Sequence, residues 1–134
     1  MDKFINKVIQ GDSLSVLKTL PDESIDCVVT SPPYWALRDY GVSGQLGLET
    51  TYQEYISKLC DIFDEVKRVL KKEGTCFVNL GDTYSTQSGA MRDGKFGPKN
   101  TNNQSFIQPK TNLPDKSLCN IPGRFSIEMQ NSDT

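Results

Sequence analysis

The sequence predicts an α/β fold with a partial parallel sheet, and two observations lead to this class. Short apolar runs typical of strands alternate with segments of helical periodicity up to about residue 80. A long amphipathic stretch separates two of these runs, as a right-handed crossover helix does between parallel strands. The predicted elements are a strand over 7–10, a helix over 13–20, a strand over 25–30, a helix over 51–72, a strand over 75–80 and a helix over 121–130.

The helix predicted over 51–72 carries a single apolar stripe. Its apolar residues recur every three or four positions, so the helix is expected to be buried in the core rather than to bind a ligand. Gly74 is expected to stop it. The stripe consists of Tyr52, Tyr55, Ile56, Leu59, Ile62, Phe63, Val66, Val69 and Leu70.

The strand predicted over 25–30 runs directly into the tetrad Ser31-Pro32-Pro33-Tyr34. Its continuous β-branched content suggests burial on both faces. Two prolines cannot continue a central strand, so the strand ends there and a rigid loop begins.

Charge and composition restrict the choice of function. The net charge is −2 and the pI about 5.1, so no basic face for gripping duplex DNA is expected. The nearest cluster, Lys67, Arg68, Lys71 and Lys72, falls in the last turns of the long helix, where cations interact favourably with the helix dipole. No membrane span or secretory signal is visible, which predicts a cytoplasmic protein.

The four cysteines, at positions 27, 60, 76 and 119, have no metal-binding or redox spacing, and histidine is absent from the sequence. Three of them fall in apolar runs. They are therefore expected to be buried free thiols, and no metal site is predicted.

Three turns follow the predicted strands, at 11–12, 31–34 and 79–82. In open α/β sheets the reactive groups lie beyond the carboxyl ends of the strands, so neighbouring strands would bring these turns to one cleft. Three strands are fewer than a doubly wound domain needs, so the sheet is predicted to be incomplete.

The tetrad has a specific chemical capacity at such a strand end. The Ser31 hydroxyl and the Pro32 carbonyl are two acceptors at a fixed spacing, because Pro33 restricts the residue before it. Two converging acceptors suit an exocyclic NH₂ group, whose nitrogen becomes more nucleophilic when its hydrogens are drawn out of the ring plane. Tyr34 offers a flat face on which a flipped base can stack. Positioning of this kind contributes about 7–11 kcal/mol at near-attack geometry.

Several stretches together resemble the N-terminal half of the β-group amino-methyltransferases that act on DNA. They are GDSLSVLKTLPDESIDCVVTSPPYWALRDYG, GQLGLE, EVKRVLKKEGTCFVNLGDTYS and KSLCNIPGRFSIEMQ, in the family's order. The resemblance implies a Rossmann-like fold, S-adenosylmethionine as cofactor and DNA as partner. A tetrad with Ser first is typical of members that methylate cytosine N4, in restriction-modification or phage protection, whereas adenine-N6 members more often carry Asp or Asn there.

The same resemblance implies roles for individual residues. Ser31, Pro32, Pro33 and Tyr34 form the site for the amino group, and Asp12 approaches the adenosyl part of the cofactor. Substrate contacts are expected from the remaining site residues, which are Trp35, Asn79, Gly81 and Asp82. Purely structural interpretations stay open for four of them: Asp12 as a helix N-cap, Trp35 as packing at the domain edge, and Asp82 with Asn79 as strand-end turn residues.

One family feature does not occur: the sequence has no Phe-x-Gly-x-Gly cofactor loop and no GxG at all. The chain is therefore expected to be a catalytic half completed by further residues or by a second polypeptide, or else an inactive fragment acting as a binding or assembly module. Adenine N6, an RNA base or a glutamine amide are alternative acceptors for the same tetrad. The predicted organisation is a catalytic α/β portion over 1–82, a flexible polar loop over 83–116 and the start of a further helix over 117–134.

Overall fold

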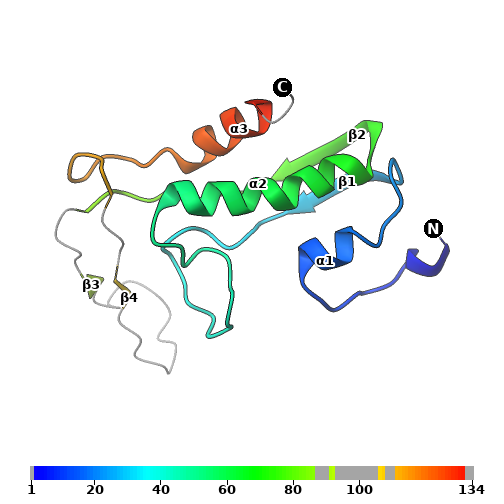
Figure 1. Cartoon of the computed structure of the whole chain (residues 1–134), viewed down its shortest axis with the longest axis horizontal. Helices are drawn as coiled ribbons and strands as arrows, with labels where there is room; N and C mark the ends of the chain where they lie inside the picture. Colours follow the sequence, from blue (N-terminus) through cyan, green and yellow to red (C-terminus); the bar gives the residue numbers. More distant parts are fainter. Residues whose placement is uncertain (1, 87–90, 93–105, 108–110, 132–134) are drawn as a thin grey trace.

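The computed structural model describes residues 2–86, 91–92, 106–107 and 111–131 (Figure 1). It contains two parallel strands with helices packed beside them, which confirms the α/β class. The predicted loop over 83–116 lies partly outside the described residues. In chain order the elements are the 3-10 helix η1 (Asp2–Phe4), α1 (Ser13–Leu17), β1 (Ile25–Thr30), α2 (Tyr52–Val69), β2 (Leu70–Val78), β3 (Met91–Arg92), β4 (Phe106–Ile107) and α3 (Ile121–Asn131).

The strands β1 and β2 are parallel neighbours joined through the crossover helix α2. Cys27 pairs with Thr75 and Thr30 with Val78, after an irregular start in which Ile25 pairs with Leu70. β3 and β4 form a separate antiparallel pair. The parallel pairing brings the carboxyl ends of β1 and β2 together, as the alternation of elements predicted.

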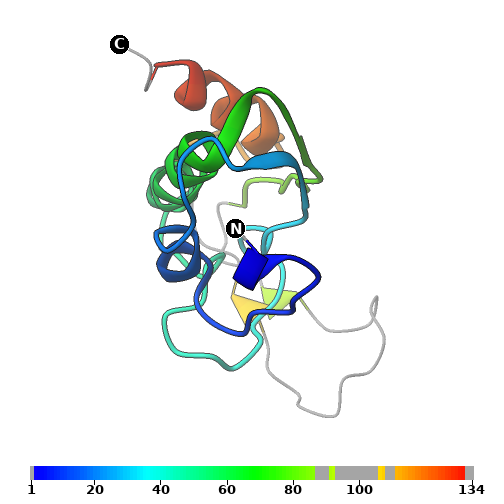
Figure 2. The same cartoon turned by 90° about the vertical axis from the view of Figure 1, so that its right-hand side faces the viewer.

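The core lies on one side of this strand pair, against α2 and α3 (Figure 2). Val28 and Val78 face the core, whereas Val29 and Phe77 on the opposite face are 78% and 61% exposed. The expectation that residues 25–30 are buried on both faces is therefore wrong for the described residues. The apolar pattern of a parallel strand is the same whether one face is covered or both, so the pattern did not predict that one face is exposed.

The helix α2 begins and ends for identifiable reasons. The Thr51 hydroxyl accepts a hydrogen bond from the Glu54 amide at 3.2 Å and caps the first turn. The helix ends at Val69, because Leu70 already has extended backbone and opens β2. The predicted stop at Gly74 is thus wrong: Gly74 lies inside β2, and strand pairing ends the helix earlier.

The buried face of α2 matches the predicted apolar stripe. Tyr55, Leu59 and Val69 are fully buried, and Phe63 packs edge-on against Phe125 of α3 with ring centroids 4.9 Å apart. The prediction of a core helix is confirmed, as is the C-terminal helix.

The strand predicted over 7–10 does not form, and this prediction is wrong. Val8 is fully exposed and Ile9 is 46% exposed, so the apolar run has no partner strand among the described residues. The helix predicted over 13–20 is confirmed in part: α1 ends at Leu17, and Asp12 is its N-cap.

Arg68, in the cationic cluster at the end of α2, lies in the last turn of the helix as predicted. It also has specific partners: it pairs with Glu65 and Asp22 and donates to the carbonyls of Leu17 and Leu20. Arg68 therefore ties the segment after α1 to α2 in addition to its favourable position at the helix end.

Lys71, by contrast, lies outside the helix. It is the second residue of β2, and its ammonium pairs with Asp26 of β1 at 2.6 Å. The expected position in the last turn of the helix is therefore wrong for this residue.

The polar segment after β2 is anchored at its base. Tyr84 and Leu118 form an antiparallel bridge, and the Cys119 amide donates to the Thr83 carbonyl at 2.8 Å. These bonds hold the start of α3 beside the turn that follows β2.

The cysteines are free, but only Cys60 and Cys119 are buried, whereas Cys27 and Cys76 are exposed. The expectation of buried thiols is therefore wrong for the two strand cysteines, because these parts of the strands have no cover. Burial, with smaller contributions from nearby acidic side chains, raises the pKa of Cys60 to about 11.

None of the described helices is both long and apolar enough to span a bilayer. Within the described ranges no group of three or more acidic or cysteine side chains could hold a metal ion.

Candidate active site

The turns after β1 and β2 meet at the carboxyl end of the strand pair. The Asn79 amide donates to the Thr30 carbonyl at 2.9 Å, so the turn over 79–82 starts directly beside the tetrad. A Cβ atom at Gly81 would lie 2.6 Å from Cδ2 of Tyr34. The Tyr34 ring can therefore occupy this position only because Gly81 has no side chain.

The tetrad presents both of its functional side chains at this end of the sheet. Ser31 is exposed and Tyr34 is half-buried. The Ser31 hydroxyl donates to the Tyr34 hydroxyl oxygen at 3.2 Å. The Ser31 and Tyr34 hydroxyls therefore lie side by side on the same turn.

A hydrogen bond from a residue of α2 holds the tetrad backbone in place. The Tyr55 hydroxyl donates to the Pro33 carbonyl at 2.8 Å. Burial, followed by the nearby Glu49 and Tyr34, raises the pKa of Tyr55 far above its ordinary value. The hydroxyl therefore stays protonated and remains a donor, and the Pro33 carbonyl is committed to this contact.

We expect Tyr55→Phe to lower the free energy of unfolding by about 0.5–1.5 kcal/mol, the net contribution of one buried hydrogen bond. Without this hydrogen bond the tetrad backbone also shifts. We therefore expect kcat of the catalysed reaction to fall by a larger factor than KM changes. Chemical denaturation measures the free energy of unfolding, and steady-state kinetics measure kcat and KM. Both are carried out on the native polypeptide, which is the protein as the cell makes it. Tyr84→Phe is a suitable control because Tyr84 is 64% exposed; equal effects of the two variants would contradict the role of Tyr55.

Trp35 lies in the core, not at the surface of the cleft. Its side chain is 1% exposed and packs edge-on against Tyr52, with ring centroids 5.9 Å apart. The indole Nε1 donates to the Glu49 carbonyl at 3.0 Å, and the Trp35 carbonyl accepts from the Thr83 hydroxyl at 3.1 Å. In this structure Trp35 supports the tetrad from behind, so the packing interpretation fits better than direct substrate contact.

Asn79 and Asp82 lie on the turn that follows β2, and both are exposed. The Asp82 carboxylate already accepts hydrogen bonds from the Thr83 amide at 2.8 Å and the Ile121 amide at 3.0 Å. Asp82 thus caps the start of α3 and joins this helix to the site.

Asp12 caps α1. Its Oδ1 atom accepts from the Ser15 amide at 2.9 Å and from the Ser15 hydroxyl at 2.8 Å. These two bonds, the backbone one first, lower the pKa of Asp12. Both bonds use the same oxygen of an exposed carboxylate, so capping leaves Oδ2 for a second role.

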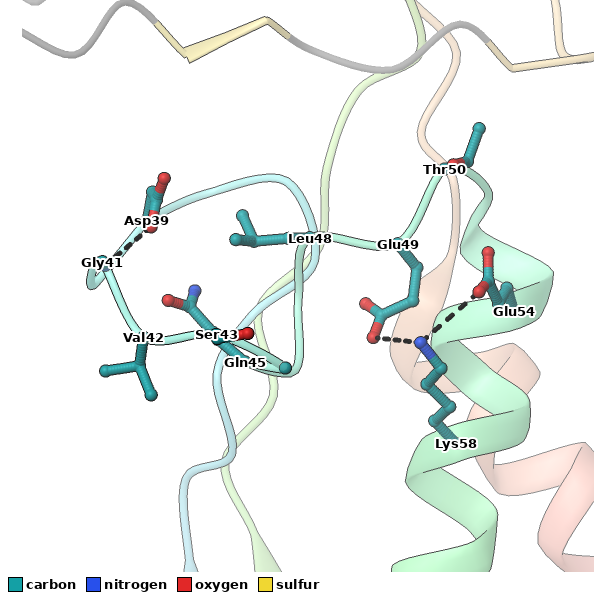
Figure 3. Close-up of a pocket in the computed structure, with 11 residues that line it drawn as sticks. Asp39, Gly41, Val42, Ser43, Gln45, Leu48, Glu49, Thr50, Glu54 and Lys58 are labelled. Atoms are coloured by element: carbon teal, nitrogen blue, oxygen red, sulfur yellow. Dashed lines mark hydrogen bonds and ion pairs between the residues drawn. The ribbon is translucent and has the colours of Figure 1, made fainter.

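Residues that the sequence reasoning missed lie beside the tetrad, on α2 and on the segment between Trp35 and α2. This segment and the first turns of α2 line a hollow of about 480 Å³ (Figure 3). Glu49 is buried there, although a carboxylate is rarely fully buried unless it is paired. Its place in GQLGLE was a signal, whereas Tyr55 was indistinguishable from an ordinary core residue of the α2 stripe.

Comparison with known proteins identifies the family to which this chain belongs. A family model described as DNA methylase matches residues 25–127, which include both parallel strands, the tetrad and α2. The chain belongs to this DNA methylase family.

Individual relatives are Type II methyltransferases. The chain is 42% identical over 125 residues to M.Cfr9I of Citrobacter freundii, covering 92% of the chain and 41% of the relative. It is 42% identical over 127 residues to M.SmaI of Serratia marcescens, covering 93% and 43%. With M.SfiI of Streptomyces fimbriatus the identity is 57% over 74 residues, covering 55% and 18%. The chain thus spans about two fifths of the length of M.Cfr9I and M.SmaI.

Proposed function

We propose that the protein transfers a methyl group from S-adenosylmethionine to the exocyclic N4 amine of cytosine in DNA, within a restriction-modification or phage-protection system. Membership of the DNA methylase family and similarity to Type II methyltransferases support the reaction class and the DNA substrate. The choice of cytosine rests on the serine that opens the tetrad.

The observation that carries this proposal is the exposed Ser31 hydroxyl beside the Tyr34 ring at the carboxyl end of β1. A flipped base stacks on the ring, and its amine then reaches the Ser31 hydroxyl oxygen. The carbonyl of Pro32 is the second acceptor, and the neighbouring Pro33 carbonyl accepts from the Tyr55 hydroxyl, which holds this backbone in place. Asn79, Gly81 and Asp82 form the neighbouring wall of the base pocket.

The two acceptors activate the amine by geometry. Hydrogen bonds to both N–H groups draw them out of the base plane, so that the nitrogen lone pair is less conjugated with the ring. With the cofactor bound, the activated nitrogen would take the methyl group, and the electron pair of the carbon–sulfur bond would stay on sulfur. The resulting ammonium would be acidic enough to lose its proton to water, so these residues would need no buried general base.

S-adenosylmethionine supplies an electrophilic methyl group when it is bound. The described residues fit one end of this cofactor: the exposed Asp12 carboxylate, whose Oδ2 is not used in capping, is a suitable acceptor for a ribose hydroxyl. We assign Asp12 to the adenosyl part on this basis. The residues that hold the rest of the cofactor belong to the remainder of a Rossmann-like domain.

M.Cfr9I and M.SmaI carry the matched region within single chains more than twice as long as the match. This favours a remainder on the same polypeptide over a second polypeptide. Base-specific DNA contacts are assigned to that remainder, since the acidic balance of these 134 residues provides no strong grip on phosphates.

The modified nucleoside tests the proposal. Unmethylated plasmid DNA is incubated with the native polypeptide and S-adenosylmethionine, digested to nucleosides and analysed by mass spectrometry, with the Ser31→Ala variant as control. We expect N4-methylcytosine with the native protein only. N6-methyladenine would contradict the assignment to cytosine, and the absence of any methylated nucleoside would contradict the proposed reaction.

A further inference from the structure

Glu49 is a buried carboxylate to which the proposed reaction gives no role. Its side chain is 1% exposed. One carboxylate oxygen, Oε2, accepts from the Gly47 amide at 2.8 Å. The other, Oε1, accepts from the Lys58 ammonium at 3.3 Å (Figure 3). Burying a charge is costly unless it is paired and hydrogen-bonded, and here both oxygens are satisfied.

Gly47, which the Glu49 carboxylate contacts, and the backbone carbonyl of Glu49 both lead directly to the tetrad. Gly47 packs against the backbone of Tyr34, because a Cβ atom at position 47 would lie 2.8 Å from the Tyr34 carbonyl oxygen. The Gly47 carbonyl accepts from the Ala36 amide at 2.9 Å, and the Glu49 carbonyl accepts from Nε1 of Trp35. Glu49 therefore holds the residues on both sides of the turn that follows the tetrad.

This turn needs external support because part of its backbone is unfavourable. Ala36 has a φ of 54° and Gly47 a φ of 98°. The left-handed region costs conformational energy for alanine, so Ala36 adopts it only where surrounding contacts require it. The hydrogen bonds through Gly47 and Glu49 are the contacts that do so here.

Lys58 tethers the carboxylate to α2. Desolvation lowers the pKa of the Lys58 ammonium, but its hydrogen bond and charge interaction with Glu49, followed by those with Glu54, outweigh this and raise the pKa overall. Lys58 is half-exposed and also pairs with Glu54 at 3.4 Å. Removal of the Glu49 carboxylate therefore leaves Lys58 with solvent and a second partner.

We propose that Glu49 is a positioning residue, which locks the segment over 36–48 against the tetrad and thereby fixes Tyr34 and the Pro32–Pro33 backbone for methyl transfer. The inference rests on the proposed function for its kinetic consequence. The coupling of Glu49 to Trp35 and Gly47 is independent of the substrate.

The variant Glu49→Met removes both carboxylate contacts and keeps a side chain of similar length. The exposed Lys58 ammonium can then be hydrated, but the Gly47 amide loses its acceptor, so we expect a folded protein with a lower melting temperature. We expect kcat to fall about 100-fold, the effect of a misplacement of roughly 1 Å, with KM for DNA and for the cofactor within about threefold of the wild type. Glu54→Gln is the matched control, because it removes the other, exposed partner of Lys58.

The second readout is the ¹⁹F resonance of Trp35 in protein labelled with 5-fluorotryptophan, assigned with the Trp35→Phe variant. We expect Glu49→Met to shift or broaden this resonance and Glu54→Gln to leave it unchanged. A kcat within threefold of the wild type, an unmoved resonance or an equal loss in Glu54→Gln would overturn the inference. If the native polypeptide methylates nothing, the proposed function fails, while a shifted Trp35 resonance still supports the coupling.

If Glu49→Met does not fold, the variant Glu49→Gln tests the positioning role of Glu49 instead. Its amide oxygen can still accept from the Gly47 amide, but its NH₂ group then faces the Lys58 ammonium. We expect kcat to fall about tenfold at unchanged KM, together with a smaller shift of the Trp35 resonance. A kcat within twofold of the wild type with an unmoved resonance would contradict the positioning role.

Discussion

Replacing Gly81 by alanine is expected to lower kcat for methyl transfer by about 100-fold, because the new methyl group displaces the Tyr34 ring. The added Cβ would lie 2.6 and 2.7 Å from two ring carbons and 3.2 Å from Cγ, too close to be relieved by a small movement of the ring edge. Tyr34 is half-buried and can swing toward solvent, so the fold should lose only the roughly 1–3 kcal/mol typical of overpacking.

The control for this prediction is a double-mutant cycle with Tyr34→Ala. If the clash with the ring carries the effect, Gly81→Ala should cost almost nothing further in the Tyr34→Ala background. Steady-state kinetics on the four proteins measure the coupling. Additive losses in kcat would mean that Gly81 acts on the base or the cofactor independently of Tyr34.

Replacing Ser31 by alanine is expected to lower kcat by about 100- to 1000-fold, the usual effect of removing one preorganised hydrogen-bonding group at a reacting centre. Ser31 is exposed, so the free energy of unfolding should stay within about 0.5 kcal/mol of the wild type. Single-turnover methylation and thermal unfolding of the native polypeptide measure the two quantities. Ser24→Ala is a suitable control, since Ser24 precedes β1 at its opposite end.

A second variant separates two possible roles of the Ser31 hydroxyl. It donates to the Tyr34 hydroxyl oxygen at 3.2 Å, and Tyr34→Phe removes this partner while keeping the ring. If Ser31 binds the amine of the base, Tyr34→Phe should lower kcat only a few-fold. Equal losses in Ser31→Ala and Tyr34→Phe would show that Ser31 acts only by orienting the tyrosine.

The elements predicted best from the sequence are those that carry a regular apolar pattern. The strand over 25–30 was predicted with its observed bounds, and the long helix with its N-terminal end, because Thr51 caps it and an apolar stripe follows. The strand over 7–10 was wrong because a strand exists only with a partner, and KVIQ has none among the described residues. The bounds of β2 depended similarly on pairing with β1.

The candidate site was predictable where it follows directly from a strand end. The tetrad and the turn with Gly81 lie together, as expected from parallel neighbours. The supporting contacts were not predictable, because they join residues far apart in sequence: Tyr55 reaches the Pro33 carbonyl across 22 positions. Sequence periodicity shows that Tyr55 is buried, but it does not show what its hydroxyl contacts.

The bare face of the strand pair has a consequence for the order of folding. β1 and β2 meet only after the crossover through α2 has closed a loop of about forty residues, so their pairing is a slow, non-local step. The core on the α2 side is complete only once α3 has also been synthesised, because Ile121 and Phe125 belong to it, whereas Val29 and Phe77 then remain in water. The nascent chain therefore passes through a stage with a finished interior and an uncovered sheet. A chaperone that binds extended apolar segments would act at this stage.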